Sequence, residues 1–234
     1  MNDSQLYQSR RKTARMAGVF YVILALALFP DMLRRSLIVA GDAATTGQNL
    51  LDNALLFRLS IVGDLICYIA FVCLALWFYS LFKDVQRDAA RLLVAFVLVC
   101  TSIAMLSISN ELTALTLLQG NDPAQAMLFL GLYKHGTMIA EIFMGLWLLP
   151  LGWLFYQSGF MPKTLGILLM LGCFAYLVDA FAGLIMPDWQ ALTKQGIMLP
   201  GLVELATVFW LLVFGVKHPA QEEPNKGNLR QLTA

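Results

Sequence analysis

Six carboxylate side chains occur within or beside stretches of this chain that are otherwise apolar. They are Asp31, Asp64, Glu111, Glu141, Asp179 and Glu204. An ionisable group is costly in hydrocarbon, so such residues usually face a protein interior or a wet cavity and indicate a functional site. Two adjacent carboxylates could act as general acid and general base, and a larger group could bind the polar part of a ligand. The elements that carry them decide whether they converge.

Composition indicates that these elements are membrane-spanning helices. The chain has 234 residues, of which 59% are hydrophobic and 13% charged, and its mean hydropathy is +0.70. Soluble domains have roughly 45–50% apolar and about 25% charged residues. The excess lies in long runs, which a bilayer accommodates as helices. The formal net charge is +1 and no basic patch is interleaved with aromatic residues, so no nucleic-acid partner is predicted.

The apolar runs predict an all-α integral membrane bundle of six transmembrane helices. The predicted spans are about 15–37, 57–82, 90–116, 133–157, 163–186 and 199–217, in one transmembrane domain over residues 1–217. Residues 218–234 are polar and are predicted to form a disordered cytoplasmic tail. Asn121 or Asp122 is expected to cap a helix that starts at Pro123. Asp42 is expected to cap a short helix between the first two spans, which could be a lid or only a connection.

The distribution of basic residues predicts the orientation. Eleven Lys and Arg residues fall at the termini and in the loops on one side, and five fall on the other side. Since cytoplasmic loops carry the excess of basic residues, both termini are predicted to be cytoplasmic. The expected location is a bacterial inner (plasma) membrane, which the chain crosses several times.

The acids then fall at a shared depth in the outer half of the bundle. By helical rise, Asp64 and Glu141 lie about 10–12 Å from the outer ends of their helices, and Asp179 and Glu204 about 8–10 Å. Lys134 and Glu141 are seven residues apart and so lie on one side of a helix. We therefore predict an outward-facing acidic chamber. Its predicted residues are Asp64, Glu111, Glu141, Asp179, Glu204, Arg58, Arg34, Arg35, Lys134 and His135.

Each acid also has a plainer explanation. It could be protonated, or paired with an arginine, and serve only to fix the register of neighbouring helices. At least one of Arg34, Arg35 and Arg58 is predicted to neutralise an acid, and Arg58 is the first choice because it lies at the outer end of the second span.

Several kinds of chemistry are disfavoured. The two histidines, His135 and His218, are predicted near opposite surfaces, which excludes a bis-histidine haem. HExxH, GxSxG and phosphate-binding glycine loops are absent. A carboxylate site for a divalent cation, with His135 at its rim, is a weaker alternative. The four cysteines lie in apolar runs and are expected to pack helices. We predict no metal and no cofactor.

Two stretches carry a resemblance to a known family. One is Gly41-Asp42-Ala43-Ala44-Thr45, followed by Leu56-Phe57-Arg58-Leu59 and Asp64-Leu65, and the other is the run GLWLLPLGWLFYQSGFMPKTLG at 145–166. The second closely resembles the signature of an uncharacterised prokaryotic integral-membrane family, domain of unknown function 4386. The resemblance covers about residues 15–217. It implies a polytopic membrane protein, and it implies no reaction and no catalytic residue.

The leading functional hypothesis is a membrane protein that binds or senses a small polar or amphipathic ligand, a lipid headgroup being one candidate, from the outer side. The alternatives are an intramembrane enzyme that uses paired carboxylates and an assembly or structural partner without a ligand. A transporter ranks lower, because the inner half of the bundle lacks acids. Membrane lipids are expected partners, and the sequence does not determine the oligomeric state.

Overall fold

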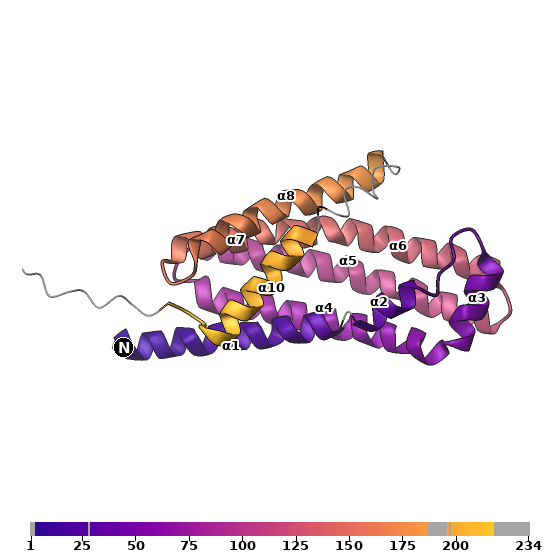
Figure 1. Cartoon of the computed structure of the whole chain (residues 1–234), viewed down its shortest axis with the longest axis horizontal. Helices are drawn as coiled ribbons and strands as arrows, with labels where there is room; N and C mark the ends of the chain where they lie inside the picture. Colours follow the sequence, from indigo (N-terminus) through magenta and orange to yellow (C-terminus); the bar gives the residue numbers. More distant parts are fainter. Residues whose placement is uncertain (1–2, 28, 187–195, 197, 218–234) are drawn as a thin grey trace, which may run out of the picture.

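The computed structural model describes residues 3–27, 29–186, 196 and 198–217 (Figure 1). Every regular element within these residues is an α-helix, which confirms the predicted all-α fold. His218 and the predicted tail at 218–234 lie outside the described residues. The helices are α1 (Asp3–Ala27), α2 (Phe29–Arg35), α3 (Ala43–Asp52), α4 (Ala54–Phe82), α5 (Arg87–Gln119), α6 (Pro123–Leu146), α7 (Leu148–Ser158), α8 (Lys163–Ile185) and α10 (Met198–Val213).

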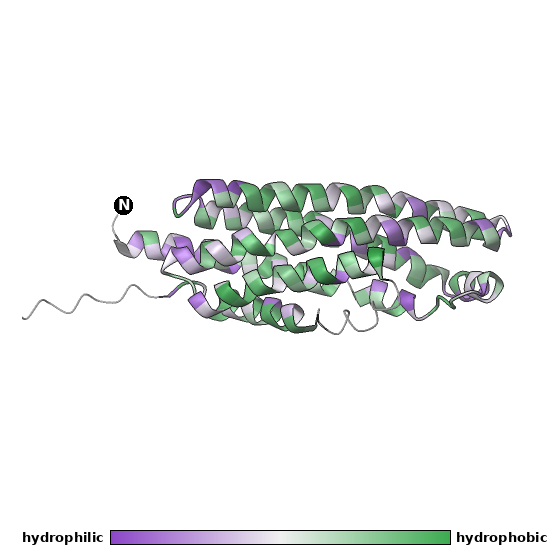
Figure 2. Ribbon diagram, turned by 90° about the horizontal axis from the view of Figure 1, so that it is seen from above, coloured by the Kyte–Doolittle hydropathy of each residue, from purple (hydrophilic) through white to green (hydrophobic). Residues whose placement is uncertain are grey.

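Five stretches of the described chain are long and apolar enough to cross a membrane. They are Ser4–Arg35, Ala54–Phe82, Arg87–Gln119, Pro123–Ser158 and Lys163–Ile185, and the shorter apolar helix α10 corresponds to the sixth predicted span. Apolar residues cover the middle of the bundle, whereas hydrophilic residues gather towards its two ends (Figure 2). The chain is therefore a multi-pass helical membrane protein. The cytoplasmic location of both termini stays a prediction.

Two prolines divide the first and fourth long stretches. Pro30 lies in the first turn of α2 and Pro150 in the first turn of α7. A proline has no N–H for the carbonyl four residues earlier and its ring crowds that carbonyl, so a continuous helix is interrupted just before it. At the first break α4 comes very close, since a Cβ on Gly63 would lie 2.5 Å from the Ala27 carbonyl oxygen. The break therefore places α2 directly beside Asp64.

Two apolar clusters form the interior of the described part of the bundle. The larger cluster centres on Trp147, whose ring centroid lies 4.9 Å from that of Phe71. The smaller cluster contains Phe57 and Ile61. On α4 the smaller cluster ends at Ile61 and the larger begins at Phe71, so Asp64 falls in the gap. Asp64 on α4 thus lies between the two clusters, whereas Glu111 on α5 lies within the smaller one, between Ile108 and Ala114.

Close helix contacts fix α7 against α8. A Cβ on Gly152 would lie 2.4 Å from the Gly166 carbonyl oxygen, and one on Gly166 would lie 2.6 Å from the Gly152 oxygen. Only glycine permits this approach. The turn between the two helices uses Gly159 in the left-handed conformation, with φ of 72°. The run at 145–166 therefore builds a tight helix pair.

The predicted helix starts are confirmed. Asp122 caps α6 by accepting a hydrogen bond from the Gln125 N–H at 3.1 Å, with Pro123 as the next residue. Asp42 caps α3 by accepting bonds from the Thr45 hydroxyl at 2.6 Å and the Thr45 N–H at 2.9 Å. Both hydrogen bonds lower the pKa of the Asp42 carboxyl, and the bond from the Thr45 hydroxyl has the larger effect. Helix α3 packs across the ends of α5 and α6, away from the cavity described below.

Candidate functional site: a buried ion cluster beside a polar cavity

Arg34 is the centre of a buried ion cluster between α2 and α5. Its side chain is only 2% exposed, and it pairs with Asp31 on α2 and Glu111 on α5. The Arg34 Nε donates to Asp31 Oδ1 at 3.1 Å. The guanidinium also lies 5.1 Å from the centroid of the Tyr133 ring. One planar, always charged group thus bridges two carboxylates that would otherwise repel.

Arg35 completes the cluster from its exposed side. Its Nε donates to Asp31 Oδ2 at 2.8 Å, and 70% of its side chain is exposed. Two guanidinium groups therefore face two carboxylates, and the formal charges balance. Glu111 Oε2 is buried and has no hydrogen-bond partner in the described part of the chain, so Arg34 is the only described ion-pair partner of Glu111.

Asp64 approaches the cluster from α4 and is held by a tyrosine. The Tyr133 hydroxyl on α6 donates to Asp64 Oδ2 at 3.0 Å. The ring of Tyr133 also contacts Arg34, so this residue links the carboxylate of α4 to the ion cluster. The Asp64 carboxyl is buried and lies behind Tyr133 rather than on an open surface.

A cavity of about 710 Å³ opens beside this cluster, between α2, α6 and α8. Its volume is within the range of about 300–1,000 Å³ that is typical of small-molecule sites. Arg34 and Arg35 line it from α2, and Tyr176 and Asp179 line it from α8. Helix α6 lines it from Met127 to Met144, with a repeat of three and four residues that presents one helical face.

Both signs of charge and several apolar side chains share this lining. The cations are Arg34, Arg35 and Lys134, and the acids are Glu141 and Asp179. The Glu141 carboxylate acts electrostatically on Arg35 and on Tyr176. Three methionines contribute apolar, adaptable surface. The cavity therefore suits a molecule with polar and apolar parts.

Glu204 lies behind the cavity wall and ties three helices together. The hydroxyl of Tyr21 on α1 donates to Glu204 Oε2 at 2.5 Å, and that of Tyr176 on α8 donates to Oε1 at 3.1 Å. Since Glu204 is on α10, the carboxylate joins α10 to α1 and α8. Tyr176 thereby presents its ring to the cavity while its hydroxyl holds α10.

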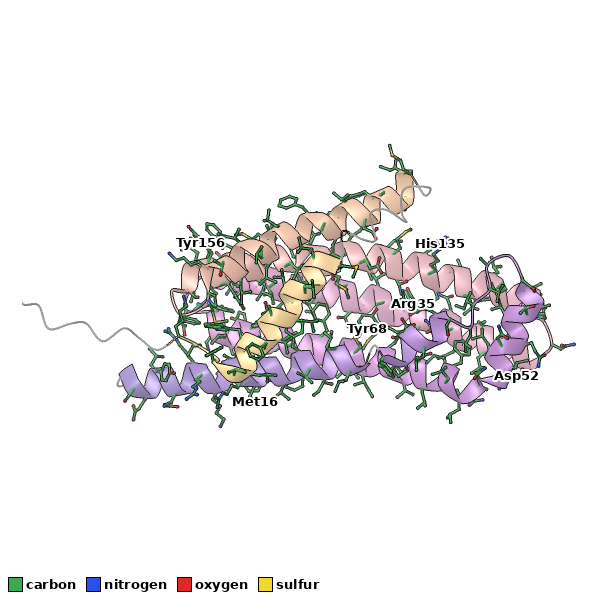
Figure 3. All side chains as sticks on the ribbon, in the orientation of Figure 1. Met16, Arg35, Asp52, Tyr68, His135 and Tyr156 are labelled. Carbon is green, nitrogen blue, oxygen red and sulfur yellow. The ribbon has the colours of Figure 1, made fainter. Side chains whose placement is uncertain are left out.

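The predicted chamber residues fall into three groups. Those that line the cavity are Arg34, Arg35, Lys134, Glu141 and Asp179, and those one side chain behind it are Asp64, Glu111 and Glu204. Arg58 and His135 are exposed and do not line it, and Figure 3 shows His135 on the outer side of α6. Arg35, by contrast, lies between α2 and α6 in that view.

Arg34 takes the position that the sequence assigned first to Arg58. The buried face of α4 contains Phe57, Ser60, Ile61 and Asp64, which follow the spacing i, i+3, i+4 and i+7. Arg58 is one residue off that face and points outwards. Its proximity to Asp64 along the chain was therefore misleading, whereas helical spacing alone already separates the two side chains.

The chamber residues predicted from the sequence include no tyrosine. Tyr21, Tyr133 and Tyr176 each place a hydroxyl on a carboxylate. The signal was a tyrosine within an apolar span, since a buried tyrosine hydroxyl usually finds a partner. Asp31 was also absent from the predicted chamber because it lies near a predicted helix end. Among the described residues, no group of three or more His, Cys, Asp or Glu side chains is placed to hold a metal ion.

Comparison with known proteins gives two matches. A family model described as "Domain of unknown function (DUF4386)" matches residues 16–215. An "Uncharacterized protein" from Archaeoglobus fulgidus is 29% identical over 158 residues, which cover 68% of this chain and 85% of the archaeal protein. No solved structure matches the chain.

Proposed function

The chain, a multi-pass membrane protein, belongs to the DUF4386 family, and from its cavity we propose that it binds a small amphipathic molecule between α2, α6 and α8. The observation that carries this proposal is the lining, which combines cations, acids and apolar side chains in one space of about 710 Å³. A cavity that is mostly apolar, with a few convergent polar groups, is the usual form of a ligand site.

The surrounding structure supports a prepared site. The Arg34 cluster and the Tyr21–Glu204–Tyr176 hydrogen bonds hold the polar walls from behind, so lining groups are oriented before a ligand arrives. Preorganisation of this kind lowers the entropic cost of binding. The excess of basic residues at the opposite end of the bundle supports an outer-leaflet position for the cavity.

Native mass spectrometry of the detergent-purified full chain tests this proposal. Gly131 lines the cavity, and a Cβ added to it would meet no atom within 4 Å, so Gly131→Phe should fill the cavity without a clash at the backbone. Gly201 on α10 is equally open and is outside the lining, so Gly201→Phe is a matched control. Wild type and the control should retain a copurified molecule that Gly131→Phe loses. Equal retention by all three proteins, or no retained molecule in wild type, would refute the proposal.

A second candidate is an intramembrane enzyme. Glu141 and Asp179 line the same cavity from facing helices, and paired carboxylates can act as general acid and base. If this candidate holds, the wild type converts the bound molecule with time, whereas Glu141→Gln and Asp179→Asn retain it unchanged. A bound molecule of constant mass in all three would leave binding as the function.

A further inference from the structure

We infer that the molecule bound in the cavity is a zwitterionic amphiphile. Its anionic group is held at the level of Arg35 and Lys134, and its ammonium group is held at the level of Glu141 and Asp179. This inference rests on the proposed binding function and adds to it the chemical class of the ligand.

The two signs of charge occupy two levels of the cavity. On α6, Lys134 and Glu141 both line it and are seven residues apart, which is about 10.5 Å along the helix axis. Arg34 lies against the ring of Tyr133, the residue next to Lys134, and both Arg35 and Lys134 line the cavity. The cationic level is therefore built by α2 and α6 together.

The acidic level is built by α6 and α8. These helices run in opposite directions (Figure 1), and Gly145 on α6 meets Tyr176 on α8, where an added Cβ would lie 2.7 Å from the tyrosine Cβ. Moving three residues forward from Tyr176 reaches Asp179, which lies level with the α6 turn that contains Glu141. Two carboxylates from facing helices thus share one level of the cavity.

The spacing of the levels fits a short zwitterion. The backbone positions of Lys134 and Glu141 are about 10.5 Å apart along the helix axis, and their long side chains can adjust the distance between the two charges. A phosphate and an ammonium joined by a two-carbon link, with a hydrogen bond of about 2.8 Å at each end, fit within this spacing. A purely anionic headgroup would meet the carboxylates, and a purely cationic one would meet Arg35 and Lys134, and like charges in contact disfavour binding.

The remaining lining explains why the ligand carries apolar chains. Met127, Met138 and Met144 lie on the same face of α6 as the charged residues. Methionine side chains are flexible and polarizable, so they accommodate hydrocarbon of varied shape. An acyl chain leaving the headgroup would contact this surface.

Lipid titration of the full chain in detergent, followed by native mass spectrometry, tests the ligand class. The probes are phosphatidylethanolamine, which is zwitterionic, phosphatidylglycerol, which is anionic, and free phosphoethanolamine, which has no acyl chains. We expect wild type to prefer phosphatidylethanolamine over phosphatidylglycerol by about tenfold or more, the factor that one charge-assisted hydrogen bond supplies. Free phosphoethanolamine should not displace the bound lipid at equal concentration.

Three variants test which side chains bind the ammonium group and which bind the anionic group. Glu141→Gln, and independently Asp179→Asn, should reduce the preference between the lipids towards equality by weakening phosphatidylethanolamine alone. Lys134→Gln should weaken both lipids. Arg58→Gln, an exposed change outside the cavity, should alter neither.

The outcomes separate failure of the inference from failure of the proposed function. The ligand is not a zwitterion if wild type binds phosphatidylglycerol equally or more tightly, or if both acid variants keep the preference of wild type. Either result would still leave a lipid-binding site. If free phosphoethanolamine displaces the lipid, the ligand does not need acyl chains, and a soluble zwitterion is identified as the ligand. Binding of none of the three probes, together with no copurified molecule, overturns the proposed function itself.

Discussion

Replacing Arg34 should destabilise this protein far more than replacing its neighbour Arg35. Arg34 is 2% exposed and is the described ion-pair partner of Glu111, whose side chain is 0% exposed. Arg34→Met would leave that carboxylate buried without its cation. Breaking a buried pair by removing one partner costs roughly 3–5 kcal/mol in free energy of unfolding.

The matched control is Arg35→Met. It removes the same functional group from the next residue, but the Arg35 side chain is 70% exposed, and its pair with Asp31 leaves Arg34 in place. Asp31 is buried, but Arg34 still neutralises it, so the loss should stay near the value of about 0–1 kcal/mol that exposed pairs contribute. A double variant tests whether the unpaired carboxylate causes the loss. Glu111→Gln added to Arg34→Met removes the charge of Glu111 and should recover at least about 1 kcal/mol of the free energy of unfolding.

The assay is equilibrium unfolding of purified protein in mixed micelles, with thermal unfolding as a second measurement. Wild type and Arg35→Met should be the most stable and close to each other. The double variant, Arg34→Met with Glu111→Gln, should be less stable, and Arg34→Met alone should be the least stable. If Arg34→Met and Arg35→Met lose the same small amount, or if Glu111→Gln restores nothing, Arg34 does not hold a buried carboxylate and the ion cluster is not the support for the cavity.

Three further predictions follow from the fold. Gly152→Ala should cost about 1–3 kcal/mol, because the new methyl group meets backbone, whereas Gly201→Ala should be neutral or stabilising in the same unfolding assay. Because the pKa of Asp42 is lowered in the folded protein, its cap contributes stability above the unfolded pKa that is lost as pH falls through the folded pKa. Hydrogen-exchange protection of α3 should accordingly decrease on acidification, and Asp42→Asn should abolish that dependence. Topology reporters at Ala234 and within 120–123 should mark opposite sides of the membrane, with Ala234 cytoplasmic, and agreement between the two would refute the orientation.

Much of the architecture was predictable because it depends on local composition. Apolar runs of bilayer length specify helices wherever they occur, since backbone groups in hydrocarbon must be satisfied within the segment. The helix starts at Asp42 and Asp122 were also predictable from local sequence. A capping side chain bonds a backbone N–H only three residues further along the chain.

The identity of the counter-ion was not predictable from proximity along the chain. Helical spacing already turns Arg58 away from Asp64, but whether Arg34 reaches Glu111 depends on the break at Pro30 and on the close approach of the chain at that break to Gly63 on α4. The partners of the acids are equally remote, since Glu111 meets a residue 77 positions away and Glu204 meets one 183 positions away.

The sequence by itself therefore determined a multi-pass helical protein with costly acids in its spans, because the energetic cost of a charge in hydrocarbon is a property of each segment. Only the tertiary structure decided which acids are buried in ion pairs, which are held by tyrosines and which line a cavity. That division depends on which helix faces come within hydrogen-bond distance, and side chains reach only a few ångströms.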